Sequence, residues 1–168
     1  DALVAGPALA DRDLGPLISA GRKAAVEVYL AAGADLRVAG RGRIDEDAPP
    51  GGYYVAPVLF ADVPPDHLLA REEIFGPVQM VIPFDDEEEA VAIANGLDGG
   101  LVASVWTRDG SRALRLARRL RAGQVFLNNY GAAGGVELPF GGVGLSGHGR
   151  EKGFEALHGF TRLKTVAA

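Results

Sequence analysis

Two stretches of the sequence combine residue types that could act on a ligand. The first, residues 71–77, reads Arg-Glu-Glu-Ile-Phe-Gly-Pro, so two adjacent carboxylates precede an aromatic residue and a Gly-Pro turn. A carboxylate here could accept hydrogen bonds from both hydroxyls of a ribose, and the aromatic residue could back a flat ring. On these residues alone, however, acids at a helix end followed by a core phenylalanine are the preferred interpretation.

The second stretch, residues 138–153, is rich in glycine. Its glycines let the backbone approach a neighbour closely, while Phe140 and Glu151 stand at fixed positions within it. A structural Ω-loop is the alternative interpretation. Residues 142–147 also match G-x-G-x-x-G literally, but that fingerprint needs a preceding strand, a helix opening within it and an acidic residue about 20 positions later. Pro139 and Phe140 precede the match and the sequence ends at Ala168, so we interpret it as accidental.

Several other chemistries are excluded or lack support. The sequence contains no cysteine, which excludes a disulfide scaffold, a thiolate metal site and a cysteine nucleophile within these residues. The three histidines, His67, His148 and His158, lack the spacing of metal ligands, so no metal is assigned. Ser146 is not in a nucleophile elbow, because His148 stands where that motif needs glycine.

Composition indicates one globular domain that does not bind nucleic acid. Of the 168 residues 48% are hydrophobic and 23% charged, and 17 Lys and Arg against 22 Asp and Glu give a net charge of −5. This charge argues against a general binder of nucleic acid or anionic membranes, and no apolar run is long enough to span a membrane. The sequence opens at Asp1 without Met, so the lack of a signal peptide says little about compartment.

The first half of the sequence predicts one helix and one strand. Apolar residues at helical spacing predict a helix over residues 19–32, with Ser19 as its N-cap and Gly33 after its end. Residues 40–52 are polar and rich in Gly and Pro, which is typical of a surface loop or hairpin. Residues 53–60 predict a strand that Pro57 limits to an edge or a bulge.

The middle of the sequence predicts a β-α-β-α-β unit. Strands are expected at residues 78–82, 101–106 and 124–128. The first intervening helix begins at Asp85 or Asp86 and ends at Asn95-Gly96, and Ser111 caps the second. The second helix should turn three residues inward: Leu114, Ala117 and Leu120.

Right-handed connections between such strands imply a buried parallel sheet covered by helices, with ligands bound at the carboxyl ends of the strands.

The second helix also carries five arginines, which we interpret as a solvated outer face rather than a phosphate site. They are Arg112, Arg115, Arg118, Arg119 and Arg121.

Several ordered motifs together resemble the NAD(P)-dependent aldehyde dehydrogenase superfamily, in the C-terminal part of its catalytic domain. The motifs occupy residues 14–18, 52–60, 72–77, 139–151 and 163–166. The resemblance covers nearly the whole chain. It implies an α/β fold of the aldehyde dehydrogenase catalytic-domain type, with a largely parallel sheet and helices on both faces, over residues 1–154. It also implies an oligomerisation strand or tail over residues 155–168, and hence a homo-oligomer, a dimer or a tetramer.

The resemblance also implies roles for four residues. Glu73 matches the glutamate that binds the nicotinamide ribose hydroxyls, and Phe75 matches the aromatic residue beside the nicotinamide. Phe140 matches the wall of the substrate tunnel, and Glu151 matches a glutamate near the proton path used in hydrolysing the acyl-enzyme. The implied cofactor is NAD or NADP, bound mainly by a domain outside these residues, and the implied substrate is a small-molecule aldehyde.

In the family, a cysteine thiolate attacks the aldehyde, hydride passes from the thiohemiacetal to the nicotinamide, and water hydrolyses the thioester. The resemblance implies that this cysteine, the base and the Rossmann domain precede the position matching Asp1, so we expect the 168 residues alone to be inactive. Residues 132–135, Ala-Ala-Gly-Gly, replace bulkier residues often found at the substrate mouth, which favours a roomy pocket.

We therefore interpret the sequence as a portion of a cytoplasmic oxidoreductase that oxidises an aldehyde to a carboxylic acid with NAD(P)+. One alternative is a non-catalytic aldehyde-dehydrogenase-like module kept for assembly or as a scaffold. Retention of both Glu73 and Glu151 argues against it. Another alternative is an independent nucleotide-binding domain.

Overall fold

The structure is a computed structural model that describes residues 3–131 and 135–167. It divides into two compact units, Asp1–Pro83 and Phe84–Ala168, and each is described by itself. The sequence analysis did not anticipate this division. Within the described residues, no helix is both long and apolar enough to cross a membrane.

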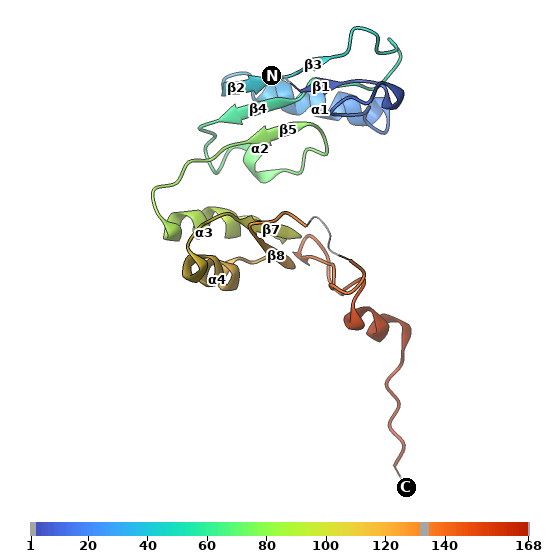
Figure 1. The fold of residues 1–168 in the computed structure, drawn as a ribbon, viewed down its shortest axis with the longest axis vertical. Helices are drawn as coiled ribbons and strands as arrows, with labels where there is room; N and C mark the ends of the chain where they lie inside the picture. The colour runs from blue at the N-terminus through green and yellow to red at the C-terminus, as the bar shows by residue number, and fades with distance from the viewer. Residues whose placement is uncertain (1–2, 132–134, 168) are drawn as a thin grey trace. The chain divides into compact units, whose positions relative to one another are not determined.

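The first unit is built on a three-stranded sheet with the strand order β2-β4-β5 (Figure 1). Strand β2 (Arg37–Arg41) runs antiparallel to β4 (Val58–Ala61), and β5 (Val78–Met80) runs parallel to β4. A short parallel pair joins β1 (Val4–Ala5) to β3 (Arg43–Ile44). The helices of this unit are the 3-10 helix η1 (Ala8–Ala10), α1 (Ala20–Ala32) and α2 (Leu68–Arg71).

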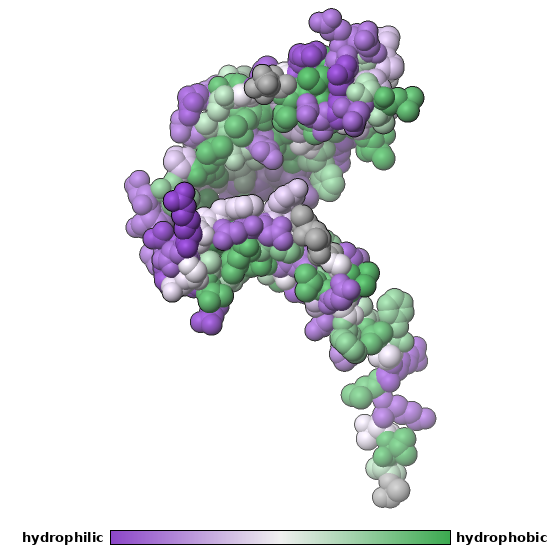
Figure 2. All heavy atoms as spheres, in the orientation of Figure 1, coloured by the Kyte–Doolittle hydropathy of each residue, from purple (hydrophilic) through white to green (hydrophobic). Residues whose placement is uncertain are grey.

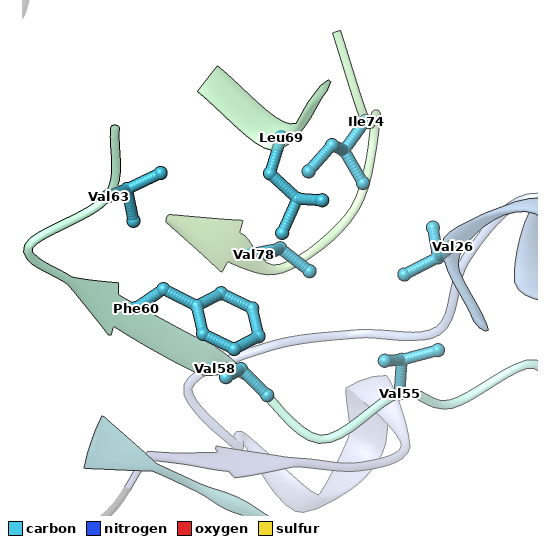
Figure 3. Close-up of a cluster of buried hydrophobic side chains, with 8 residues drawn as sticks. All are labelled: Val26, Val55, Val58, Phe60, Val63, Leu69, Ile74 and Val78. Atoms are coloured by element: carbon cyan, nitrogen blue, oxygen red, sulfur yellow. The ribbon is translucent and has the colours of Figure 1, made fainter. Parts of the chain in front are cut away.

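Buried aliphatic and aromatic side chains from the sheet, α1 and α2 form the core of this unit. Figure 3 shows the cluster: Val26, Val55, Val58, Phe60, Val63, Leu69, Ile74 and Val78. The helix predicted over residues 19–32 is confirmed, and the Ser19 side chain accepts a hydrogen bond from the Arg22 N–H at 3.1 Å. Gly33 caps its C-terminus at a φ of −97°, and a Cβ there would lie 2.9 Å from Leu69 Cδ2. Glycine is therefore needed at this position for close packing.

Two sequence-based expectations for the first unit need correction. Residues 40–52 are not wholly a loop, because β3 and the end of β2 lie within them. The strand expected over residues 53–60 begins only at Val58, and β4 is the central strand of its sheet. Pro57 precedes it, where the missing N–H costs no ladder hydrogen bond, so Pro57 does not force an edge position.

The second unit contains α3 (Glu87–Asn95), β6 (Gly99–Gly100), β7 (Val102–Val105), α4 (Gly110–Arg119), β8 (Gln124–Leu127), β9 (Val143–Gly144) and the 3-10 helix η2 (Phe154–Phe160). Strands β7 and β8 pair in parallel, as the β-α-β pattern predicts, and Figure 1 shows α3 and α4 next to them. Strands β6 and β9 pair antiparallel. An α/β architecture is therefore confirmed.

The expectation of one buried parallel sheet through all three predicted strands stays a prediction, because the strands belong to two units that are described separately. Within the first unit β5 runs parallel to β4, and within the second unit β7 runs parallel to β8 in a pair in which only Val105 is buried. The cap predicted at Ser111 is also wrong, because Asp109 accepts hydrogen bonds from the N–H groups of Ser111 and Arg112. Leu114, expected to point inward, is 56% exposed, and Ala113 is buried instead.

The chain ends in a segment with exposed apolar residues. Residues 161–167 form no helix or strand, and Leu163 and Val166 are exposed. Figure 2 shows that hydrophobic and hydrophilic residues both occur along this segment.

Candidate functional site

The first group of predicted site residues lies between α2 and β5. Ile74 is 5% exposed and packs in the core of the first unit, while Glu73 on one side of it and Phe75 on the other are exposed. Beyond them, the Val58 N–H donates to the Pro77 carbonyl at 2.9 Å. The core therefore fixes this backbone from both ends and turns Glu73 and Phe75 outward.

Phe75 has an unusual backbone conformation and an exposed ring. Its φ of 52° lies in the left-handed region, which a bulky residue adopts only where the surrounding structure imposes it. The ring is 66% exposed, and the guanidinium carbon of Arg22 lies 5.5 Å from its centroid. The interpretation of Phe75 as a core residue, which residues 71–77 alone favoured, is wrong.

The Glu73 carboxylate is available for a ligand. Among residues 3–131 and 135–167, no hydrogen bond or ion pair to this carboxylate is present. Its neighbour Glu72 serves instead as the C-cap residue of α2. An exposed carboxylate with both oxygens free can accept two hydrogen bonds, which is the requirement for holding the two hydroxyls of a ribose.

The second group lies in the second unit, where Phe140 and Glu151 face each other across an antiparallel bridge. Each N–H donates to the other residue's carbonyl at 2.7 Å. Directly opposed residues of such a bridge place their side chains on the same face. The Gln124 side chain donates to the Pro139 carbonyl at 2.8 Å and fastens this bridge to β8. The structure thus brings together two residues that are distant in the sequence.

A cavity of about 240 Å³ adjoins this bridge. It is lined in part by Gln124, Phe126, Phe140 and Lys152, and the Lys152 ammonium lies 5.6 Å from the centroid of the Phe140 ring. Three of the four residues on which a roomy substrate mouth was expected, 132–134, lie outside the described residues. That expectation stays a prediction.

The backbone conformation of the glycine-rich loop, residues 138–153, explains why glycine occurs there so often. Gly144, Gly147, Gly149 and Gly153 all have positive φ values between 56° and 103°, which residues with a side chain rarely adopt. Residues 142–147 form strand β9 and turns, and no helix opens within them. The interpretation of their G-x-G-x-x-G match as accidental is confirmed.

Electrostatic contacts in the second unit join α3 to α4. Arg112 and Arg115 both donate to the Glu87 carboxylate, at 2.5 and 2.9 Å, and Arg119 donates through both terminal nitrogens to Glu88 at 2.6 and 2.5 Å. The hydrogen bonds from Arg115 and Arg112 lower the pKa of Glu87. The five arginines are therefore not simply a solvated face, because three of them bind the first turn of α3.

A buried ion pair in the first unit was missed by sequence reasoning. Asp45 is 7% exposed, accepts a hydrogen bond from the Asp47 N–H at 3.0 Å and pairs with Arg12. These contacts, the Asp47 N–H first and Arg12 second, lower the pKa of Asp45. No local pattern links Arg12 to Asp45, so the sequence carries no signal for the pair. It fastens the β1–β3 region and is distant in sequence from the predicted site residues.

Metal binding has no structural support in the part of the chain that the structure describes. There, no three His, Cys, Asp or Glu side chains lie close enough together to hold a metal ion. Of the predicted site residues with a carboxylate, Glu73 is exposed in the first unit and Glu151 in the second.

Comparison with known proteins defines the class to which this fold and these residues belong. The model of the aldehyde dehydrogenase family matches residues 1–166. The chain therefore belongs to the aldehyde dehydrogenase family, a family of enzymes.

Relatives that are similar in sequence and relatives that are similar in structure are both named as aldehyde dehydrogenases. The chain is 45% identical to the betaine aldehyde dehydrogenase of Rhizobium leguminosarum bv. trifolii over 98% of this chain and 34% of that protein. It is 54% identical to the NADP/NAD-dependent aldehyde dehydrogenase PuuC of Escherichia coli, over 67% of this chain and 22% of that one. A crystal structure from Burkholderia cenocepacia, assigned to the aldehyde dehydrogenases, matches with a TM-score of 0.95 and 61% identity, over 99% of this chain and 35% of that one.

A further solved relative contains a cofactor. The Mycobacterium tuberculosis aldehyde dehydrogenase complexed with NAD+ matches with a TM-score of 0.85 and 40% identity, over 96% of this chain and 33% of that one. The chain thus spans about a third of the length of three of these relatives, 34% for the Rhizobium protein, and its match to PuuC covers 22% of that protein.

Proposed function

We propose that this chain is the C-terminal part of the catalytic domain of an aldehyde dehydrogenase that oxidises an aldehyde to a carboxylic acid with NAD+ or NADP+. The observation that carries the proposal is the family match over residues 1–166, combined with an exposed, unpaired Glu73 and an exposed Phe75 on a backbone that the core fixes. These two residues fit a nicotinamide nucleotide, which supplies hydride acceptance when bound.

Each of the four residues then has one task. Glu73 accepts the hydrogen bonds of the nicotinamide ribose, and Phe75 offers the face of its ring to the nicotinamide. Phe140 forms a wall beside the reacting carbon. Glu151, opposite Phe140 across the bridge, holds or moves a proton during hydrolysis of the acyl-enzyme.

The nucleophile and the main cofactor domain lie, in this proposal, in a part of the protein that these residues do not contain. The 168 residues include no cysteine, and the chain spans 34% of its Rhizobium relative. We therefore expect no dehydrogenase activity from these residues alone. Residues 1–154 belong to the catalytic domain, and residues 155–168 join a second subunit's sheet in a dimer or tetramer. A cytoplasmic location stays a prediction.

The test compares the 168 residues with the product of the complete reading frame around the codon for Asp1. Both proteins are given an aldehyde panel that includes betaine aldehyde, with NAD+ or NADP+, and formation of reduced nicotinamide is followed by absorbance. We expect activity only from the longer product. Activity of the 168 residues alone would contradict the proposal, and an inactive longer product would favour the non-catalytic scaffold.

A matched pair of substitutions tests the role of Glu73 in that longer product. Glu73→Gln weakens the acceptor for the ribose hydroxyls, so we expect a KM for the cofactor raised about tenfold, the cost of one or two hydrogen bonds to a charged group. Glu72→Gln removes the same charge one residue earlier and should leave the KM unchanged. Equal effects of both substitutions would refute the assignment.

A further inference from the structure

The contact between Arg22 and Phe75 is not explained by the fold alone. The guanidinium carbon lies 5.5 Å from the ring centroid, which is within the range of a cation–π contact. With Arg22 in place, Phe75 is still 66% exposed. The pair places a permanent positive charge beside the ring proposed to receive the nicotinamide.

The position of Arg22 is set by the start of α1. Its N–H donates to the Ser19 side chain at 3.1 Å, which fixes the first turn of the helix. One turn later, Val26 is fully buried and packs beside Gly76, where a Cβ would lie 2.5 Å from Val26 Cγ2. The helix and the Phe75 segment are therefore in direct contact.

The charge of Arg22 is not cancelled by a neighbour. Within the described part of the chain, the guanidinium makes no ion pair with a carboxylate. Its effect on a bound ligand then depends on the charge of that ligand. An oxidised nicotinamide ring carries a positive charge and a reduced one does not. If the nicotinamide stacks on the face of Phe75 opposite Arg22, the guanidinium repels the oxidised form and not the reduced one.

We propose that Arg22 is a positioning residue for Phe75 that also weakens binding of the oxidised cofactor relative to the reduced one. This inference rests on the proposed function. A nicotinamide stacked about 3.5 Å beyond the ring would lie roughly 9 Å from the guanidinium. At that distance, an effective dielectric constant between about 80 and about 20 gives a roughly twofold to twentyfold difference in affinity.

The test measures dissociation constants in the complete enzyme that contains this chain, by fluorescence for the reduced cofactor and by calorimetry for the oxidised one. Arg22→Gln removes the charge, so the ratio of the dissociation constants, oxidised over reduced, should fall twofold to twentyfold. Arg22→Lys keeps the charge and loses the planar stacking group, so both constants should rise while their ratio stays. High salt should reduce the effect of Arg22→Gln.

Two controls keep the inference separate from folding and from the proposed function. Lys23→Gln removes the neighbouring charge in the same helical turn and should leave the ratio unchanged. An Arg22→Gln enzyme that binds both cofactor forms with the original ratio would overturn the inference. An unsubstituted enzyme that binds neither form would instead refute the proposed function.

Discussion

Replacing Gly76 with alanine tests how the core holds Glu73 and Phe75 outward. A Cβ at this position would lie 2.5 Å from Val26 Cγ2 and 3.1 Å from Cγ1. Val26 is fully buried and β-branched, so its methyl groups cannot rotate out of the way. Overpacking of this kind costs about 1–3 kcal/mol of unfolding free energy.

A second substitution shows whether the contact with Val26 causes the destabilisation by Gly76→Ala. Val26→Ala removes two buried methyl groups and should by itself cost about 2 kcal/mol, from lost burial and the resulting cavity. It also makes room for the new methyl group of Gly76→Ala. The double variant should therefore be less destabilised than the sum of the two single variants, by about 1 kcal/mol or more.

Amide hydrogen exchange measured by NMR gives the protection of individual amides in each of the two units. In the first unit, the amides of Val58 and Val81 donate to the carbonyls of Pro77 and Phe60, both at 2.9 Å, and should lose protection in Gly76→Ala. In the second unit, the Asn128 amide, which donates to Val105, serves as the control. Unchanged protection in Gly76→Ala, or strictly additive effects in the double variant, would refute the packing argument.

Three further predictions concern helix caps and ion pairs. Ser19→Ala removes the cap of α1 and should cost about 1 kcal/mol in urea unfolding; an unchanged midpoint would contradict this role. Asp109→Ala should lower the melting temperature because Asp109 caps α4, whereas Ser111→Ala should leave it unchanged. The reverse result would support Ser111 as the cap, as the sequence predicted. The lowered pKa values of Asp45 and Glu87, from ordinary values of 3.8 and 4.5, mean that their contribution to stability is complete above about pH 4.5 and is lost as the pH falls through the lower folded-state values. Melting temperatures measured across this range should fall on acidification, and a flat profile would contradict the ion pairs.

The sequence by itself determined the features that depend on near neighbours in the chain. The cap of α1 at Ser19 was predicted correctly, and the cap of α3, Asp86, is one of the two aspartates predicted, because a capping side chain bonds an N–H three residues later. The parallel pairing of β7 and β8 also follows from local information, since a helix of ten residues joins the two strands. The glycines of the loop after β8 reflect backbone angles that each residue must adopt by itself.

The candidate site was only partly predictable. The ordered motifs pointed to Glu73, Phe75, Phe140 and Glu151, but the residue types of 71–77 alone favoured a core phenylalanine. That preference was wrong because burial alternates along the segment, and Ile74 rather than Phe75 enters the core. Periodicity cannot choose between two adjacent apolar residues in an irregular segment.

The tertiary structure decided the contacts between residues that are distant in the sequence. It paired β5 with β4, and it placed Arg22 on the ring of Phe75. It also set Glu87 between Arg112 and Arg115. Each of these contacts depends on how elements pack after they form, and packing is determined by the shapes and charges of both partners together. A single sequence encodes the partners without showing which of them meet.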